Sequence, residues 1–157
     1  MPTVYIETTI VSYLTAWPSR DLIRAAHQQI THEWWETRRG DFSLYVSQLV
    51  LEEAAAGNTT AAAERLDKLA GVPLLDYRDP TLVLAGTLER ALQLPPQARG
   101  DALHVAICAA NGIEYLLTWN CRHLANAALA PTIEQACRAH GVTAPRIVTP
   151  EQLLELP

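Results

Sequence analysis

Short apolar runs alternate along this chain with longer stretches of helical periodicity. The runs that predict strands are residues 4–6, 45–47, 115–118 and 147–148, and the pair Leu74–Leu75 adds a short further strand. Continuous apolar runs separated by helices are typical of strands buried on both faces of a parallel sheet. The pattern therefore predicts an α/β fold.

A long helix is predicted after the first strand. Ser19 is a plausible N-cap, and the helix should run to about Arg39 and end at Gly40. One stripe of this helix is expected to face the core: Leu22, Ala26, Ile30 and Trp34. The neighbouring Trp34 and Trp35 cannot both lie on that stripe, so one of them covers a partner surface or, as the default, packs within the chain.

The other helices are predicted from periodicity and from their Pro and Gly boundaries. They are expected at residues 8–16, 49–56, 60–70 and 80–92, then in a segment that carries Asp101 and ends at 111–112, at 132–140, and in a short piece at the C-terminus. We find no internal repeat or linker, so residues 1–157 are predicted to form a single domain.

Four oxygen-bearing residues follow the apolar runs or open the next helix. Glu7 and Asn120 come directly after strands, Glu53 lies one turn beyond the second strand, and Asp101 stands at a helix start. In an open parallel sheet the ligand crevice lies outside the carboxyl ends of the strands, so these residues are expected to converge. Clustered carboxylates repel and tend to recruit a cation. Oxygen ligands suit Mg²⁺ or Mn²⁺, and such a site favours phosphodiester hydrolysis.

Four segments together resemble a known family. Residues 5–9, 46–57, 101–106 and 117–120 look like the successive motifs of PIN-domain nucleases, and of VapC-type toxins in particular. The resemblance extends over nearly the whole chain, although each motif is short. It implies a three-layer α/β/α fold with a central, mainly parallel sheet, and a metal-dependent endoribonuclease activity.

The resemblance also assigns the site residues. Glu7 stands where the family usually has its first Asp, and Glu53 and Asp101 match the second and third acidic positions. These three carboxylates are the expected metal ligands. Asn120 falls where a fourth acidic residue is common and joins them as an expected catalytic residue through its carbonyl oxygen. His123 falls where another Asp often follows. Three carboxylates should hold one metal ion more easily than two.

Further residues are expected to support the site. The hydroxyls of Thr8 and Thr118 can orient a carboxylate or hold a water. Arg99, Arg122 and His123 are expected to contact the substrate, although an ordinary solvated surface is the alternative for any single arginine.

Several site residues have a simpler interpretation. Glu7 could merely cap the following helix, where a negative charge is favoured. Glu52 and Glu53 cannot share a helix face, and the spacing favours Glu53 for the site. His104 lies one turn after Asp101 and is more typical of a hydrogen-bonded packing residue than of a ligand.

Composition narrows the function classes. The formal net charge of −5 argues against a general nucleic-acid binder, but part of the acidity belongs to the proposed metal site, so a nuclease is still possible. Three cysteines without a C-x-x-C pair predict reduced thiols in a cytoplasmic protein. Neither a signal peptide nor a membrane span is visible.

We therefore expect an endoribonuclease that uses Mg²⁺ or Mn²⁺ to hydrolyse RNA, as the toxin of a toxin–antitoxin pair. An antitoxin protein and a second copy of the chain are the possible protein partners. Two alternatives stay open: a PIN-like protein-binding module with weak or no activity, and a nuclease that acts on structured DNA.

Overall fold

A five-stranded sheet forms the centre of the molecule. The computed structural model describes residues 1–157, and all the strand pairs in it are parallel. The strand order is β3-β2-β1-β4-β5, with β1 (Thr3–Ile6), β2 (Ser43–Ser47), β3 (Leu74–Leu75), β4 (Tyr115–Leu117) and β5 (Arg146–Val148). The middle strand is the most buried, since Val4, Tyr5 and Ile6 have no exposed surface. The predicted parallel sheet is confirmed.

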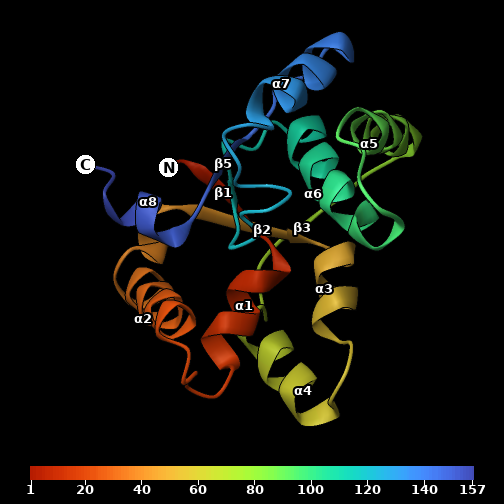
Figure 1. Ribbon diagram of the computed structural model, residues 1–157. Helices are drawn as coiled ribbons and strands as arrows, with labels where there is room; N and C mark the ends of the chain where they lie inside the picture. The colour runs from red at the N-terminus through yellow and green to blue at the C-terminus, as the bar shows by residue number, and fades with distance from the viewer.

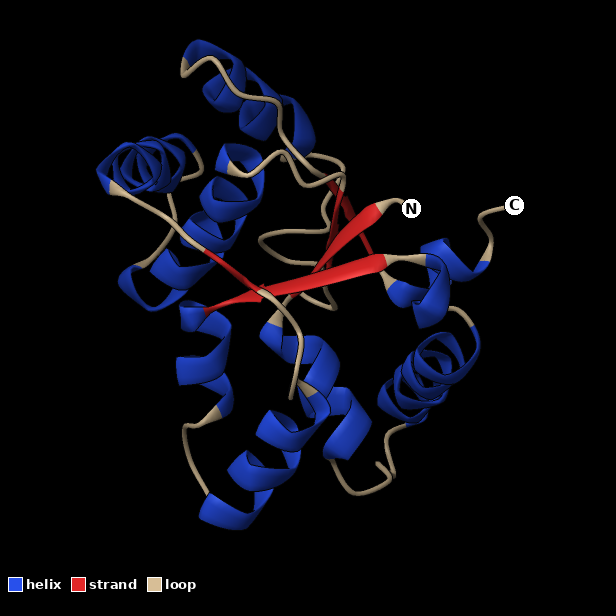
Figure 2. Ribbon diagram, turned by 180° about the vertical axis from the view of Figure 1, so that it is seen from behind, coloured by secondary structure: helices blue, strands red, loops and turns tan.

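Helices cover both faces of this sheet (Figures 1 and 2). One layer contains α1 (Thr8–Thr15), α2 (Leu22–Thr37), α3 (Gln48–Ala54) and α4 (Thr59–Lys68), and α8 (Pro150–Leu154) packs against α2. The other layer contains α5 (Asp79–Ala91), α6 (Arg99–Ala110) and α7 (Ala130–Ala139). Short 3₁₀ turns, η1 (Arg39–Asp41) and η2 (Pro96–Ala98), precede β2 and α6. The three-layer α/β/α architecture is therefore confirmed.

Two helices begin directly at strand ends, which fixes the polar residues there. Glu7 follows β1 and is the N-cap of α1, because its side chain accepts a hydrogen bond from the Thr9 backbone N–H. Ser47 ends β2 and caps α3 in the same way, through the Val50 N–H. No loop intervenes, so the first turns of α1 and α3 lie at the carboxyl edge of the sheet.

The start of α2 differs from the prediction. Asp21 is its N-cap, and its side chain accepts from the Arg24 N–H at 2.8 Å. The Ser19 hydroxyl accepts from the N–H of Asp21, before the helix begins. Ser19 therefore begins the turn that leads into the helix but does not cap it.

The buried stripe of α2 also differs from the predicted one. Of the predicted stripe, Trp34 is fully buried and Ile30 packs against the core, but Leu22 is 86% exposed and Ala26 is exposed. Gln28, Thr31 and Trp35 are also buried, and they are spaced by three and four, so they share one helix face. Two of them are polar, and for this reason a hydrophobic pattern does not detect the stripe. Thr31 is satisfied there by the His27 carbonyl and by the Trp119 indole N–H.

Both tryptophans of α2 pack inside the chain. Trp34 is fully buried with its ring centroid 5.9 Å from that of Phe42, and the Arg39 guanidinium lies 4.8 Å from the centroid of Trp35. The intramolecular default is confirmed, and the suggestion that one of the pair covers a partner surface is wrong. Trp119 is buried as well, with its ring stacked on His27. None of the helices combines the length and hydropathy of a membrane span.

Candidate metal site at the carboxyl edge of the sheet

Glu7 is the most enclosed acidic side chain of the predicted site, with 5% of its surface exposed. Its Oε2 accepts from the Thr9 N–H at 2.9 Å, and its Oε1 accepts from the Thr9 hydroxyl at 2.6 Å and from the Thr118 hydroxyl. The helix-cap interpretation is thus correct in its geometry. A cap needs only the backbone contact, however, and the two hydroxyls fix the carboxylate in one orientation.

Glu53 reaches the same place from α3. Its Oε1 accepts from the Thr8 hydroxyl and from His104 Nε2, both at 2.7 Å, while its Oε2 has no hydrogen-bond partner in the protein. Burial raises the pKa of Glu53. The hydrogen bond from His104, the charge of His104 and the hydrogen bond from Thr8 together lower it by more, so the pKa of Glu53 lies below its usual value. The Glu53 side chain is 38% exposed, and the side chain of its neighbour Glu52 is exposed as well but makes no hydrogen bond within the protein.

A buried hydrogen-bond relay holds His104 in place. The Tyr5 hydroxyl lies 2.7 Å from both Ser47 Oγ and His104 Nδ1, and Ser47 Oγ accepts from the Val50 N–H. With Glu53 ionised, His104 Nε2 donates to it. A neutral ring then accepts at Nδ1 from Tyr5, which accepts from Ser47, whereas a protonated ring donates at Nδ1 to Tyr5, which then donates to Ser47. Burial raises the pKa of Tyr5 well above its ordinary value, so Tyr5 stays protonated and can donate.

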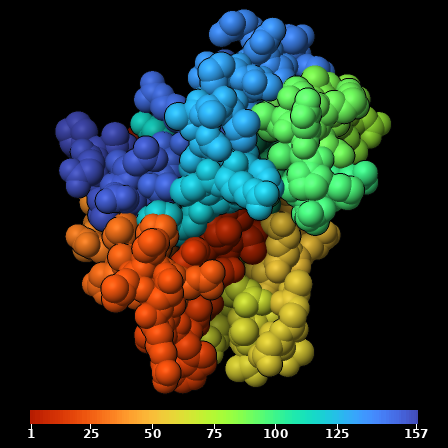
Figure 3. All heavy atoms as spheres, in the orientation of Figure 1, coloured from red at the N-terminus to blue at the C-terminus, as the bar shows by residue number.

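Glu7, Glu53 and His104 together form a group that could hold a metal ion. One ligand atom from each lies within 4.8 Å of the others, and no second such group of His, Cys, Asp or Glu residues occurs in the chain. Carboxylates suit Mg²⁺, and an added imidazole extends the choice to softer divalent ions. Glu53 Oε2 is free to bind, whereas His104 Nε2 joins a metal only if its bond to Glu53 opens. Figure 3 shows that the first part of the chain, coloured deep red, is exposed in the middle of one face, where orange, teal and yellow segments border it.

Asp101 lies beside this group but is not a member of it. It occupies the first turn of α6, one turn before His104, and its Oδ2 is 3.1 Å from His123 Nδ1. A Cβ atom at the neighbouring Gly100 would lie 3.3 Å from Glu53 Oε2, so the start of α6 abuts the site. The structure thus brings together two of the three predicted carboxylates, with His104 as the third member. The helical spacing from Asp101 is the only sequence signal for His104.

The remaining predicted residues surround these acids. Thr8 and Thr118 contact Glu53 and Glu7 directly. Asn120 Oδ1 accepts from the His123 N–H at 2.9 Å and stabilises the turn after β4. Thr9 was not predicted, yet it contacts Glu7 twice and accepts from the Trp119 N–H. In the sequence, the one feature that pointed to Thr9 was its position two residues after Glu7, a candidate helix-capping acid.

The two predicted arginines differ in their surroundings. Arg99 forms an ion pair with Glu89 at 2.9 Å, with its side chain 66% exposed, so the pair is a weak, solvated one. Arg122 is exposed and forms no ion pair.

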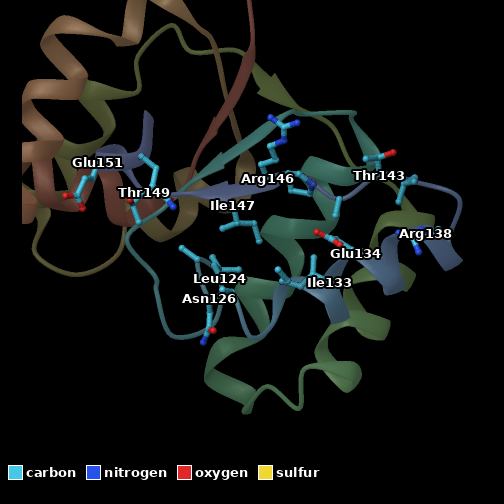
Figure 4. Close-up of a pocket in the computed structure, with 17 residues that line it drawn as sticks. Leu124, Asn126, Ile133, Glu134, Arg138, Thr143, Arg146, Ile147, Thr149 and Glu151 are labelled. Atoms are coloured by element: carbon cyan, nitrogen blue, oxygen red, sulfur yellow. The ribbon is translucent and has the colours of Figure 1, made fainter. Parts of the chain in front are cut away.

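A hollow of about 740 Å³ lies beside β5 and α7, and none of Glu7, Glu53 and His104 lines it. Figure 4 shows Ile147, Ile133 and Leu124 among its walls. Its charged residues are two acids, Glu134 and Glu151, and two bases, Arg138 and Arg146. None of them belongs to the metal-binding group, so this hollow is not the predicted site.

Comparison with family models, with curated proteins and with solved structures finds no match to this chain. Function has therefore to be inferred from the geometry of the site and from the motifs of the sequence.

Proposed function

We propose that this protein is a metal-dependent endoribonuclease of PIN type, which hydrolyses RNA phosphodiester bonds with Mg²⁺ or Mn²⁺. The observation that carries the proposal is the convergence of Glu7, directly after β1, with Glu53 of α3 and His104 of α6 at the carboxyl edge of a parallel sheet. This edge is where open α/β sheets bind ligands. The motif resemblance adds RNA as the substrate and an antitoxin as the partner.

Each residue has a defined task in this proposal. Glu7 and Glu53 hold the cation, which supplies charge neutralisation for phosphodiester hydrolysis when it is bound. Thr8, Thr9 and Thr118 keep the two carboxylates oriented through the hydrogen bonds described above.

Asp101 and Arg122 act on the substrate side. Asp101 Oδ1 has no protein hydrogen bond, so it is free to accept from a water or from the RNA. The unpaired guanidinium of Arg122 faces solvent two residues after Asn120 and can contact a phosphate.

One observation favours the alternative of a PIN-like binding module. The bond from His104 to Glu53 partly satisfies the site without any cation. In that case the chain would act through a protein partner, and its carboxylates would be structural.

Cleavage of RNA separates the two functions. Purified wild type should cleave a fluorogenic RNA with Mn²⁺ or Mg²⁺ and not with EDTA. Glu53→Gln and Asp101→Asn should lose most of this activity. Glu52→Gln is the matched control, since it changes the exposed neighbouring carboxylate. A single-stranded and a structured DNA of the same sequence test the other substrates. No metal-dependent cleavage by wild type, or equal rates for Glu53→Gln and Glu52→Gln, would rule out the proposed nuclease.

A further inference from the structure

Large apolar side chains are exposed where α1 leads into α2. Trp17 is 91% exposed, Leu22 is 86% exposed and Ile23 is 70% exposed. The other three tryptophans of the chain are buried. An exposed aromatic ring with apolar neighbours is uncommon on a protein surface that has no ligand or partner.

The backbone that carries Trp17 is fixed. Gln28, on α2, is 7% exposed and donates from Nε2 to the Trp17 carbonyl at 3.0 Å, while its Oε1 accepts from the Ser19 N–H at 2.9 Å. One buried amide thus ties both sides of the turn at Pro18 to α2. The indole is therefore held out into solvent from a fixed position.

A groove runs along one face of α1, from a residue that contacts the candidate metal site to the residue before Trp17. It has a volume of about 310 Å³ and is lined by Thr9, Ser12, Tyr13, Ala16, Arg24 and Gln28. At one end Thr9 donates its hydroxyl to Glu7, and at the other end Ala16 immediately precedes Trp17. An occupant of the groove would therefore lie between Thr9, which contacts Glu7, and Ala16, which precedes Trp17.

The groove also carries positive charge that no protein carboxylate neutralises. The Arg24 guanidinium lies 6.0 Å from the centroid of the Tyr13 ring, and neither Arg20 nor Arg24 forms an ion pair. The adjacent carboxylate, Asp21, caps α2 through the backbone N–H of Arg24. In a chain of net charge −5, unpaired arginines beside an acidic site give a polyanion a local point of contact.

We propose that this groove and Trp17 bind the single-stranded RNA that flanks the scissile phosphate. A base stacks on the Trp17 indole, and the backbone phosphates contact Arg24 and Arg20. Aromatic faces beside cationic side chains are the usual platform for unpaired bases, because every base has a π-face. The proposal rests on the proposed nuclease function and specifies single strands as its substrate.

Binding is measured in EDTA, so that it does not depend on cleavage. A single-stranded RNA oligonucleotide should quench the fluorescence of Trp17, the one exposed tryptophan. Trp17→Ala should raise the dissociation constant for the RNA by roughly ten-fold or more. Trp17→Phe should recover most of the lost affinity, because stacking tolerates another aromatic ring. The logarithm of the affinity falls with the logarithm of the salt concentration, and Arg24→Gln should make this slope less steep by about 0.7. Val83→Ala and Arg78→Gln, exposed positions in the opposite helix layer, are the matched controls and should bind as wild type does.

Hydrolysis of the same RNA with Mn²⁺ is followed in parallel. RNA binding that depends on Trp17, without hydrolysis, would support the proposed RNA-binding role of the groove and refute the proposed nuclease function. Hydrolysis by wild type with an unchanged affinity in Trp17→Ala would refute the groove alone. Wild type that does not bind RNA would overturn the proposal. A wild-type dimer that Trp17→Ala dissociates, with RNA affinity unchanged, would assign this surface to a second copy of the chain and also overturn it.

Discussion

Hydroxyl groups hold the two carboxylates at the carboxyl edge of the sheet. Glu7 receives three hydrogen bonds from Thr9 and Thr118, and Glu53 receives one from Thr8. These contacts explain why a glutamate suits position 7. The side chain is long enough to cap α1 with one oxygen and to meet the Thr118 hydroxyl of the neighbouring strand end with the other.

Glu7→Gln should therefore destabilise the fold as well as the site. The amide nitrogen cannot face the Thr9 N–H, and in place of Oε1 it makes the Thr9 and Thr118 hydroxyls accept from a neutral group instead of donating to a charge. We therefore expect a loss of about 1–3 kcal/mol in the free energy of unfolding. Glu7→Asp shortens the side chain by roughly 1.5 Å and should also weaken Mn²⁺ binding. Urea denaturation and Mn²⁺ titration measure the two effects. A Glu7→Gln variant as stable as wild type would contradict the observed hydrogen bonding.

The cysteines give a second test at the residue scale. Burial raises the pKa of Cys108 well above its ordinary value and that of Cys137 to about 11, and both thiols are shielded. Cys121 is exposed, although partial burial raises its pKa too. In the native protein near pH 8, a disulfide reagent should therefore modify Cys121 alone, and more slowly than a free cysteine. All three thiols should react in guanidinium. Fast modification of Cys108 in the native state would contradict the packing of α6.

Part of the site was predictable at this scale. Glu7 and Glu53 follow apolar runs, and parallel topology brings the ends of such runs to one edge. The third member was not predictable in the same way. His104 belongs to the group because Tyr5, itself hydrogen-bonded to Ser47, satisfies its Nδ1 inside the core. A sequence does not show which buried polar residues are hydrogen-bonded to one another.

At the scale of elements, a relay of side chains connects three parts of the fold. Tyr5 comes from β1, Ser47 from the junction of β2 and α3, and His104 from α6. Because the two helices lie on opposite faces of the sheet, the relay fixes α6 relative to the strand ends. It thereby determines where Glu53 can accept its bond from His104.

Tyr5→Phe should break this relay at its centre. The change leaves His104 Nδ1 and Ser47 Oγ without their buried partner, so we expect the free energy of unfolding to fall by about 1–3 kcal/mol. Tyr45→Phe is the matched control, because Tyr45 lies opposite Tyr5 in the sheet and its hydroxyl has no protein hydrogen bond. Chemical denaturation compares the two variants. Equal stabilities for them would show that the relay contributes nothing.

Strands were more predictable than the burial of α2. The apolar runs at 4–6, 45–47, 74–75, 115–118 and 147–148 all lie in or at the end of observed strands, because a strand buried on both faces is apolar throughout. The helix α2 instead buries Gln28 and Thr31, whose polar groups bind the Trp17 turn and Trp119. Tertiary hydrogen bonds decide that orientation, and they are absent from any local pattern.

At the scale of the whole molecule, the acidic site couples metal binding to stability. A cation that binds the folded chain and not the unfolded one stabilises it by about 2.7 kcal/mol when its concentration is one hundred times the dissociation constant. For a domain of this size, the melting temperature should then rise by about 5 to 10 °C. Scanning calorimetry with Mn²⁺ and with EDTA checks this shift. Its persistence in Glu53→Gln would mean that the ion binds elsewhere.

The central claim is that Glu7 and Glu53 form a divalent metal site, and direct titration tests it best. Mn²⁺ is titrated by calorimetry into wild type, Glu53→Gln and Glu52→Gln under identical conditions. We predict that wild type and Glu52→Gln bind alike, and that Glu53→Gln binds at least ten-fold more weakly, since it loses a charged ligand. Equal affinities for Glu53→Gln and wild type, or no binding by wild type, would contradict the claim.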